Sequence, residues 1–366
     1  MRPETEAELV ELVRAARGPL VVRGGGTRPI GRPVLGEVLE TGGLSGVRLY
    51  EPGALTLVAG AGTPLDEVEA LLAESGQRLA FEPMDHRRLM GSMGAPTLGG
   101  VVAGNVSGPR RVQAGACRDF LIGVRFVDGT GALVKNGGRV MKNVTGYDLV
   151  KLMAGSWGTL GVLSEVALKV LPAPEAEATL LWQDLAAPGA VALMAAALGS
   201  PFEVSGAARL PDGRVGLRIE GFAGSVAYRA GELARVLARF GVPARIEAGQ
   251  SRAFWAGVRD VAPFQGRAGD VWRVVLKPSE APVVAAMGEA LIDWGGGLVW
   301  LLVPEGLDLR ARMGAVPGHA TLVRASAATR ARLAPFPPEP APVAALSRSI
   351  RAQFDPRGIL NAGLMD

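Results

Sequence analysis

The chain has 366 residues, a length that indicates about two domains. Apolar residues make up 48% of the sequence and charged residues 20%, as in a globular protein with a large core, and a net charge of +4 is too small to indicate nucleic-acid binding. The longest apolar run, 190–198, is too short to span a bilayer, and the N-terminus lacks the apolar core of a signal peptide, so we expect a cytoplasmic protein.

Residues 1–174 are rich in glycine and in short apolar runs that are typical of strands. The sequence begins with an amphipathic helix, in which Thr5 and Glu8 fit a capping box and Leu9, Leu12 and Val13 share one face. A second helix is predicted for 64–75, with Thr63 as its cap and an apolar stripe of Leu65, Val68, Leu71 and Leu72. Strands are predicted at 20–22, 56–62, 120–127, 131–135 and 160–171. This order indicates an α+β fold rather than a regular βαβ repeat.

Pro172, Pro174 and the acidic stretch after them mark a domain boundary, and a second domain is predicted for 175–333. Its elements follow the order βαββαβ of a split-βαβ (ferredoxin-like) sandwich: strand 179–185, helix 188–200, a hairpin around 211–213, helix 224–240 and strand 243–249. The pattern then partly repeats, with strand 271–278, helix 281–294 and strands 296–304 and 319–326. We therefore expect one antiparallel sheet with helices on one face.

The last segment, 334–366, consists of a proline-rich linker, a helix over 343–354 and a short tail. A proline-rich linker is extended, so it can carry the tail back to the first domain.

The stretch VVRGGGTRPIG, 21–31, places three glycines directly after a predicted strand. Successive N–H groups in such a turn can converge on an anion. A Walker loop is excluded because Thr27-Arg28-Pro29 follows the glycines, and a Rossmann fingerprint is excluded because Pro29 stands where glycine is needed. These residues alone leave both an anion site and an ordinary tight turn open.

The sequence contains two further glycine-rich stretches, 95–111 and 142–166. They form an ordered set with three earlier segments: the glycine loop of 21–31, the stretch AGAGTPLDE, and FEP (81–83). This set resembles the FAD-binding domain of the vanillyl-alcohol oxidase and p-cresol methylhydroxylase (PCMH) superfamily. Within it, the chain is most similar to the small E-type subunits of bacterial glycolate oxidase complexes, over nearly its whole length. The resemblance implies a PCMH-type two-lobed FAD-binding domain over 1–174 and an antiparallel-sheet cap domain over 175–333.

The resemblance also implies which residues bind FAD. The pyrophosphate is expected on the backbone of Arg23, Gly24, Gly25, Gly26 and Thr27. Pro83 and the turn of Thr97, Leu98, Gly99 and Gly100 are expected along the cofactor, with Asn105, Ser107 and Gly108 near the flavin end. Gly158, Gly161 and Val162 are expected on the adenine side, and Asn361 at the ring edge. Noncovalent binding is expected because Thr27 stands where covalently linked members often carry histidine.

One departure from the family pattern, in the tail, affects these expectations. Ala362 and Leu364 replace the proline and arginine that the family usually shows in the tail, which leaves tail docking open. Lys142 and Asn143 are further candidates to approach the cofactor.

The residues for substrate oxidation are harder to find, and no catalytic residue is assigned. The histidine-rich cap motif of the large catalytic relatives is missing, and His86 and His319 lie far apart without metal-ligand spacing. Arginines on predicted strands are candidates for a substrate carboxylate or simple surface charges: Arg209, Arg218, Arg273 and Arg324. We therefore expect no metal site in this chain.

The single cysteine, Cys117, excludes an iron–sulfur cluster ligated by this chain alone. The resemblance implies a homologous large flavoprotein subunit that oxidises the substrate, an iron–sulfur subunit as a second partner, and membrane contact only through partners. Two alternatives remain: a noncatalytic scaffold subunit that descends from a flavoenzyme, and a stand-alone FAD-dependent alcohol oxidase.

Overall fold

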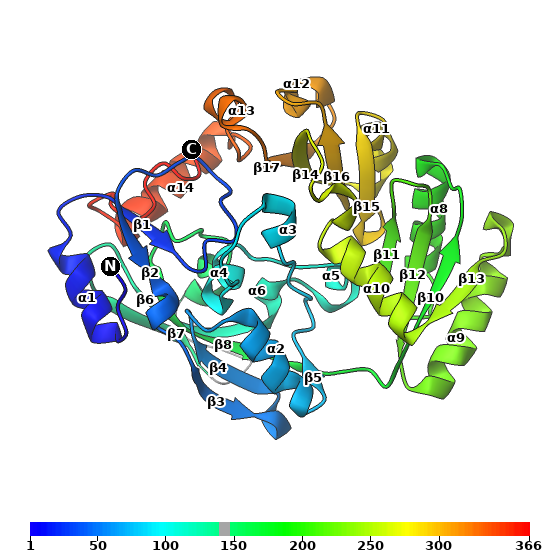
Figure 1. Cartoon of the computed structure of the whole chain (residues 1–366), viewed down its shortest axis with the longest axis horizontal. Coiled ribbons are helices and arrows are strands. Elements are labelled where there is room, and N and C mark those ends of the chain that lie inside the picture. Colours follow the sequence, from blue (N-terminus) through cyan, green and yellow to red (C-terminus); the bar gives the residue numbers. More distant parts are fainter. Residues whose placement is uncertain (139–146) are drawn as a thin grey trace.

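The computed structural model describes residues 1–138 and 147–366 (Figure 1). Its first sheet is antiparallel and has the order β3 (Val47–Glu51), β4 (Thr56–Gly60), β8 (Val162–Lys169), β6 (Leu121–Val127) and β7 (Leu133–Gly137). A parallel pair, β1 (Leu20–Arg23) and β2 (Glu37–Glu40), lies beside it, and β5 (Gln77–Arg78) pairs with β9 (Leu171–Pro172). The predicted strands of this region are confirmed, whereas β2 and β3 lacked a clear sequence signal.

Seven helices accompany these strands in the described part of the chain: α1 (Glu6–Ala15), α2 (Leu65–Glu74), α3 (Arg87–Met90), α4 (Leu98–Ala103), α5 (Arg111–Ala114), α6 (Cys117–Phe120) and α7 (Leu149–Met153). Thr5 caps α1 as predicted, since its side chain accepts the N–H of Glu8. The predicted cap of α2 is wrong. Pro64 occupies the N-cap, and the Thr63 hydroxyl instead accepts the N–H of Gly46 and donates to the Gly60 carbonyl.

The second sheet is antiparallel and has eight strands, in the order β13 (Ala244–Glu247), β10 (Ala176–Trp182), β12 (Val215–Gly221), β11 (Gly206–Arg209), β15 (Glu289–Asp293), β16 (Leu298–Val303), β14 (Asp270–Leu276) and β17 (Gly318–Arg324). The predicted helix over 281–294 is wrong. Its first part is the short helix α11 (Ala281–Ala285), and its second part is β15. β15 pairs with β11 and β16 and so joins the two halves of the sheet, which outweighs the local helical pattern.

Helices lie on both faces of this sheet. α8 (Ala187–Leu198), α9 (Ala223–Val236) and α11 share one apolar core. α10 (Ala248–Arg259) lies on the other face, because Ser251 and Trp255 both contact the Thr179 hydroxyl, which points away from that core. The expectation of helices on one face is therefore wrong. α10 packs between this sheet and the first half of the molecule. Trp255, Phe264 and Trp300 of the second half belong to the same apolar core as Phe81 and Leu98 of the first half.

The chain ends with α12 (Leu309–Met313), α13 (Ala327–Arg332) and α14 (Ala341–Phe354), and then returns to β1 (Figure 1). Leu20 donates its N–H to the Ile359 carbonyl at 2.7 Å, and Asn361 donates to the Leu20 carbonyl at 3.0 Å. We propose domain boundaries at 174 and 333, since residues 173–175 link β9 to β10 and the proline-rich stretch follows α13. No helix in residues 1–138 and 147–366 combines the length and the apolar character that a bilayer crossing requires.

Candidate cofactor-binding site

A cavity of about 570 Å³ opens between the loop after β1, helix α4 and the C-terminal tail. Four arginines line it: Arg23, Arg28, Arg32 and Arg330. No aspartate or glutamate does so in the part of the chain that the structure describes. A cavity with this lining favours a ligand that carries negative charge.

The loop after β1 lines this cavity with residues whose N–H groups are unpaired in the described part of the chain. Among the described residues, the amides of 24–28 have no acceptor in the chain. Gly26 adopts φ +66°, which favours glycine. A Cβ on Gly25 would overlap the Ala95 carbonyl oxygen, and one on Gly24 would overlap the Thr97 hydroxyl. The glycines therefore let the loop lie directly on the neighbouring segment while five successive donors stay available for an anion.

The N–H groups of 98–100, in the turn after Pro96, are already bonded within the chain. Leu98 donates its N–H to Thr63, Gly99 to Ala61, and Gly100 to the side chain of Thr97. Thr97, Gly99 and Gly100 line the cavity, whereas Leu98 is fully buried in the core. A Cβ on Gly99 would overlap Ala61, so the two glycines bring bare backbone close to the ligand.

Arg28 is a largely buried cation in the cavity wall. Its Nη1 donates to the Gly100 carbonyl at 2.6 Å, and its Nε is buried without a partner among the described residues. Asp85, which lies near enough to act on its charge, is already paired with Arg87 at 2.8 Å. Burial lowers the pKa of Arg28 to about 10. A guanidinium in this position lacks a counter-ion, and an anionic ligand would supply one.

The tail closes the cavity on the side of β8. The Asn361 side chain accepts the N–H of Val22 and donates to the Trp157 carbonyl, both at 2.8 Å, and Asn361 itself adopts φ +45°. Gly158, Gly161 and Leu364 also line the cavity, and Arg32 donates its N–H to the Leu364 carbonyl. The tail is thus docked despite Ala362 and Leu364.

Six expected contact residues lie outside the cavity lining: Pro83, Leu98, Asn105, Ser107, Gly108 and Val162. The Asn105 and Ser107 side chains accept the N–H groups of Arg118 and Cys117, and the Gly108 carbonyl accepts Trp294 Nε1. Asn105, Ser107 and Gly108 thus stabilise the connection between α4 and α5. The role of all six as cofactor contacts stays a prediction. Lys142 and Asn143 lie outside the described residues.

Arg28 and Arg330 line the cavity but were not predicted from the sequence as site residues. Arg28 follows the glycine loop directly, so its position in the sequence was a usable signal. Arg330 comes from α13, about 300 residues later, and donates to the Pro29 carbonyl at 2.6 Å. No local pattern connects these two segments. Trp157, another lining residue, packs edge-on against Phe336 at 5.3 Å.

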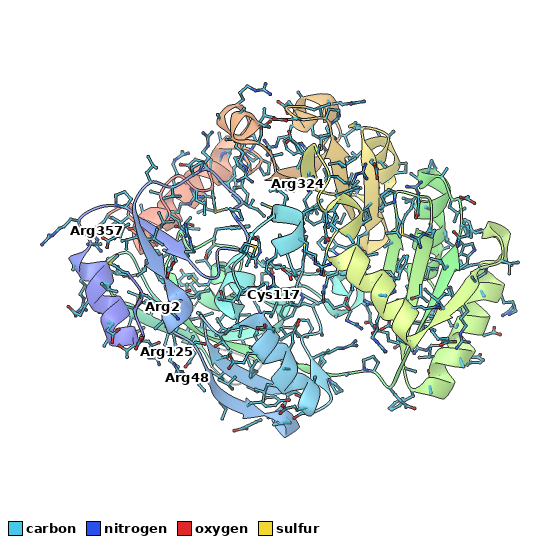
Figure 2. All side chains as sticks on the ribbon, in the orientation of Figure 1. Arg2, Arg48, Cys117, Arg125, Arg324 and Arg357 are labelled. Carbon is cyan, nitrogen blue, oxygen red and sulfur yellow. The ribbon has the colours of Figure 1, made fainter. Side chains whose placement is uncertain are left out.

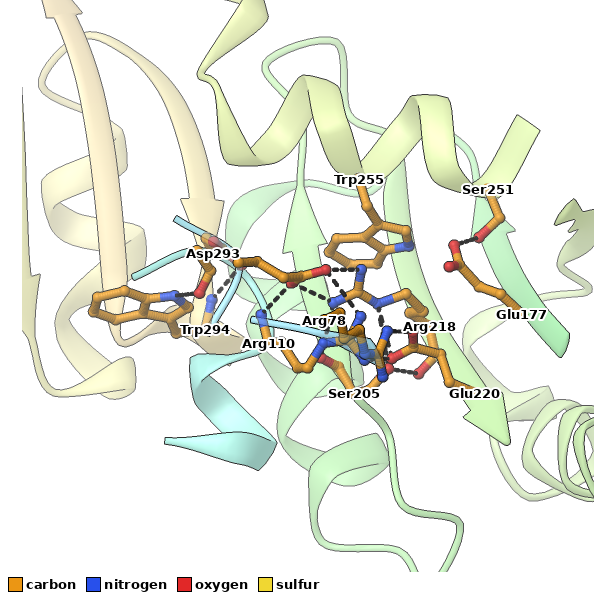
Figure 3. A network of polar contacts seen from close by, with 12 residues as sticks. Arg78, Arg110, Glu177, Ser205, Arg218, Glu220, Ser251, Trp255, Asp293 and Trp294 are labelled. Carbon is orange, nitrogen blue, oxygen red and sulfur yellow. Dashed lines mark hydrogen bonds and ion pairs between the residues drawn. The ribbon is translucent and has the colours of Figure 1, made fainter. Parts of the chain in front are cut away.

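A buried ionic network joins the two halves of the molecule (Figure 3). Glu82 accepts two hydrogen bonds from Arg218 at 2.8 Å and two from Arg110 at 2.9 Å, one from its backbone N–H and one from Nη2. Glu220 pairs with Arg110 and, at 2.9 Å, with Arg78. The two arginines hold the pKa of Glu82 at about 2 against the opposing effect of burial. Arg218, one of the candidates for a substrate carboxylate, is therefore already occupied by a carboxylate of the protein.

Two other candidate arginines are also engaged. Arg209 donates to the Leu185 carbonyl, and Arg324 donates to the Phe264 and Arg267 carbonyls.

Two of the remaining candidate groups, Cys117 and His86, are buried. Cys117 is buried in the interior (Figure 2), and burial raises the pKa of its thiol to about 12. Burial and the nearby Arg28 hold the pKa of His86 well below its usual value, so this ring is neutral, and its Nδ1 lies 3.2 Å from the Met84 carbonyl. Among the described residues, no three His, Cys, Asp or Glu side chains are grouped to hold a metal.

Comparison with known proteins decides the family. Residues 1–137 match the family model described as FAD binding domain. The chain is 38% identical to the glycolate oxidase subunit GlcE of Escherichia coli (strain K12) over 363 residues, which cover 98% of this chain and 96% of that protein. The chain belongs to the GlcE family. The likeness to GlcE confirms the predicted family, and the match to the FAD binding domain confirms the expected FAD-binding fold and FAD as the cofactor.

Two further comparisons place this GlcE-family chain more widely. It is 32% identical over 177 residues to the glycolate oxidase subunit GlcD of Bacillus subtilis (strain 168), a stretch that covers 45% of this chain and 34% of that protein. Its structure superimposes on an alkyldihydroxyacetonephosphate synthase with a TM-score of 0.71 at 16% identity, over 99% of this chain and 76% of that one. At this identity the likeness concerns the fold.

Proposed function

We propose that this chain is the FAD-binding subunit of a multi-subunit glycolate oxidase, and that its cavity holds FAD with the diphosphate on the amides of 24–28. One observation carries the proposal. Five successive N–H groups without an acceptor among the described residues border a cavity that four arginines line. A diphosphate supplies both the acceptors and the negative charge that this arrangement lacks.

The chain's own residues would bind and orient the cofactor. When bound, FAD supplies the capacity to accept two electrons from a hydroxy acid and to pass them on. The loop amides hold its diphosphate, and Arg28 balances its charge from inside the protein. Asn361 fixes β1 to the tail and so closes the cavity. We propose noncovalent binding, since Thr27 is buried in the loop and offers no ring nitrogen.

We assign substrate oxidation to a homologous large subunit. Proton removal from a hydroxy acid needs a base. In the described part of the chain, His86 is buried and its pKa is held well below the usual value, which makes its ring a weak and inaccessible base, and Cys117 is buried as the thiol. We further propose an iron–sulfur subunit as electron acceptor; any such cluster would need the cysteines of a partner, since this chain has only one. The complex would lie in the cytoplasm, with any contact to the inner face of the membrane made through the partners.

The visible spectrum of the purified chain tests this function. We expect flavin absorption bands, and acid precipitation should release the colour into the supernatant. Colour that stays in the pellet would contradict noncovalent binding. A colourless chain that takes up no added FAD would contradict the cofactor role and favour a scaffold subunit. Anaerobic glycolate should leave the isolated chain oxidised, and rapid bleaching would show a stand-alone oxidase instead.

A further inference from the structure

Two guanidinium groups approach a single indole ring where the two halves of the chain meet. Arg111 of α5 lies 4.5 Å from the centre of the Trp294 ring, and Arg273 of β14 lies 5.2 Å from it. Arg273 is also 6.0 Å from the ring of Trp300. Trp294 and Asp293 adjoin the buried ionic network beside Arg110 (Figure 3). Like charges are thus held together at two half-buried residues.

Neither guanidinium has a protein partner. Within residues 1–138 and 147–366, Arg111 and Arg273 donate no side-chain hydrogen bond and form no ion pair. Arg310 shows the contrast. It lies 4.9 Å from the Trp272 ring, and its nitrogens donate to three backbone carbonyls. A guanidinium that stacks on an aromatic ring can therefore still donate hydrogen bonds to other partners. In the described chain, Trp294 is the only ring that two guanidinium groups approach without hydrogen-bond partners of their own.

The nearby ionisable groups do not balance this charge. Burial and the charge of Arg111 lower the pKa of Arg273 to about 10, so both arginines are charged at neutral pH. Burial raises the pKa of Asp293, the adjacent carboxyl, to about 7. Its Oδ1 accepts the N–H of Trp294 at 2.7 Å. His86, which also lies near Arg273, is neutral. Asp119, whose charge acts on Arg111, is exposed and lies 4.0 Å from Arg118. The site therefore keeps a net positive charge at pH 7 and below.

We propose that Arg111 and Arg273 bind the carboxylate of a small 2-hydroxy or 2-oxo acid between α5 and β14. A carboxylate accepts paired hydrogen bonds from a guanidinium fork, and two forks can share its oxygens. The rings of Trp294 and Trp300 would cover the short carbon chain. The anion site rests on the geometry alone, whereas the choice of acid rests on the proposed function. The oxidation itself stays with the large subunit.

Tryptophan fluorescence of the full chain, titrated with glycolate and with glyoxylate at constant ionic strength, tests this site. We expect a saturable change for one or both acids in the wild type, and at least a tenfold weaker affinity in Arg273→Met and Arg111→Met. Arg273→Lys keeps the positive charge but loses the paired donors of the guanidinium, so its affinity for the acid should lie between those of the wild type and Arg273→Met. Arg239→Met, which removes an exposed arginine from the ring of Phe240, is the matched control and should bind as the wild type does.

Three outcomes would overturn the proposal: no saturable change with either acid, unchanged affinity in Arg273→Met, or equal competition by chloride, which would show an unselective anion site. Circular dichroism checks the fold of each variant, and Arg273→Lys and Arg111→Met serve if Arg273→Met does not fold. FAD content is measured in the same samples. A wild-type chain that holds no FAD but still binds the acid would refute the cofactor proposal and leave this one standing.

Discussion

Replacing Arg28 by methionine should change the stability of the cofactor-free and FAD-bound chains in opposite directions. Without a ligand, the guanidinium of Arg28 is largely buried, and its Nε has no partner among the described residues. Methionine has a similar length and no charge, so it removes this penalty. With FAD bound, the same change removes the charge that balances the diphosphate. A residue that only packs would not produce this reversal of sign.

The expected size follows from the pKa of Arg28. Its fall from an ordinary value of about 12.5 to about 10 corresponds to roughly 3 kcal/mol, at about 1.4 kcal/mol per pKa unit. Water in the cavity screens part of this, so we take about 2 kcal/mol. The lost hydrogen bond to Gly100 costs about 1 kcal/mol. Net stabilisation of the cofactor-free chain is then about 1 kcal/mol.

This penalty depends on pH in a defined way. Below pH 10 the guanidinium is charged in both the folded and the unfolded chain, so the penalty is present in full at neutral pH. As the pH rises above 10, the folded chain releases the proton first, and the wild type gains stability relative to the variant.

Urea unfolding of the cofactor-free protein and fluorescence titration with FAD measure the two effects. Arg28→Met should raise the free energy of unfolding by about 1 kcal/mol and weaken FAD binding about 100-fold, as expected for loss of one partner of a buried charge pair. Arg32→Met, in the same cavity but exposed, should change stability by less than about 0.5 kcal/mol. A less stable cofactor-free Arg28→Met, or unchanged FAD affinity, would refute the reasoning.

Three further variants test other parts of the structure. Gly25→Ala should lower FAD content at least tenfold, because its Cβ overlaps the Ala95 carbonyl, whereas Gly224→Ala has free space and should keep full content by absorbance. Glu82→Gln should lower the free energy of unfolding in urea by about 3 kcal/mol. This difference from the wild type should vanish as the pH falls from about 4.5 through about 2, where Glu82 becomes protonated. Glu232→Gln, in an exposed ion pair, should lower the free energy of unfolding by under about 0.5 kcal/mol. Asn361→Ala should cost about 2 kcal/mol locally and speed tryptic cleavage after α14, because Val22 and Trp157 lose their partner; wild-type cleavage rates would argue against tail docking.

The sequence predicted elements well where local pattern and long-range pairing agree. β1 and its glycine loop, the hairpin of β11 and β12, and the returning tail all lie where expected. The segment 281–294 failed because its second part pairs with β11 and β16, and these contacts are invisible in the local pattern. α10 was missed, and with it the second face of the sheet.

The candidate site likewise has a part that local sequence predicts and a part that depends on contacts between distant segments. The loop 23–27 and the glycines around the cavity follow from turn chemistry, which depends on neighbouring residues. Arg330 could not be found, because α13 meets the loop only in the folded chain. Arg273 stood out from Arg209, Arg218 and Arg324 only when the partners of each were known. Arg273 is a candidate for anion binding because its guanidinium has no hydrogen-bond or ion-pair partner among the described residues.

The central claim is that the amides of 24–28 bind the diphosphate of FAD, and a crystal structure of the FAD complex tests it most directly. The account predicts diphosphate oxygens within about 3.2 Å of at least three of these five nitrogens, with Arg28 as the nearest buried cation. A diphosphate bound elsewhere in the cavity, with these amides still facing solvent, would contradict it.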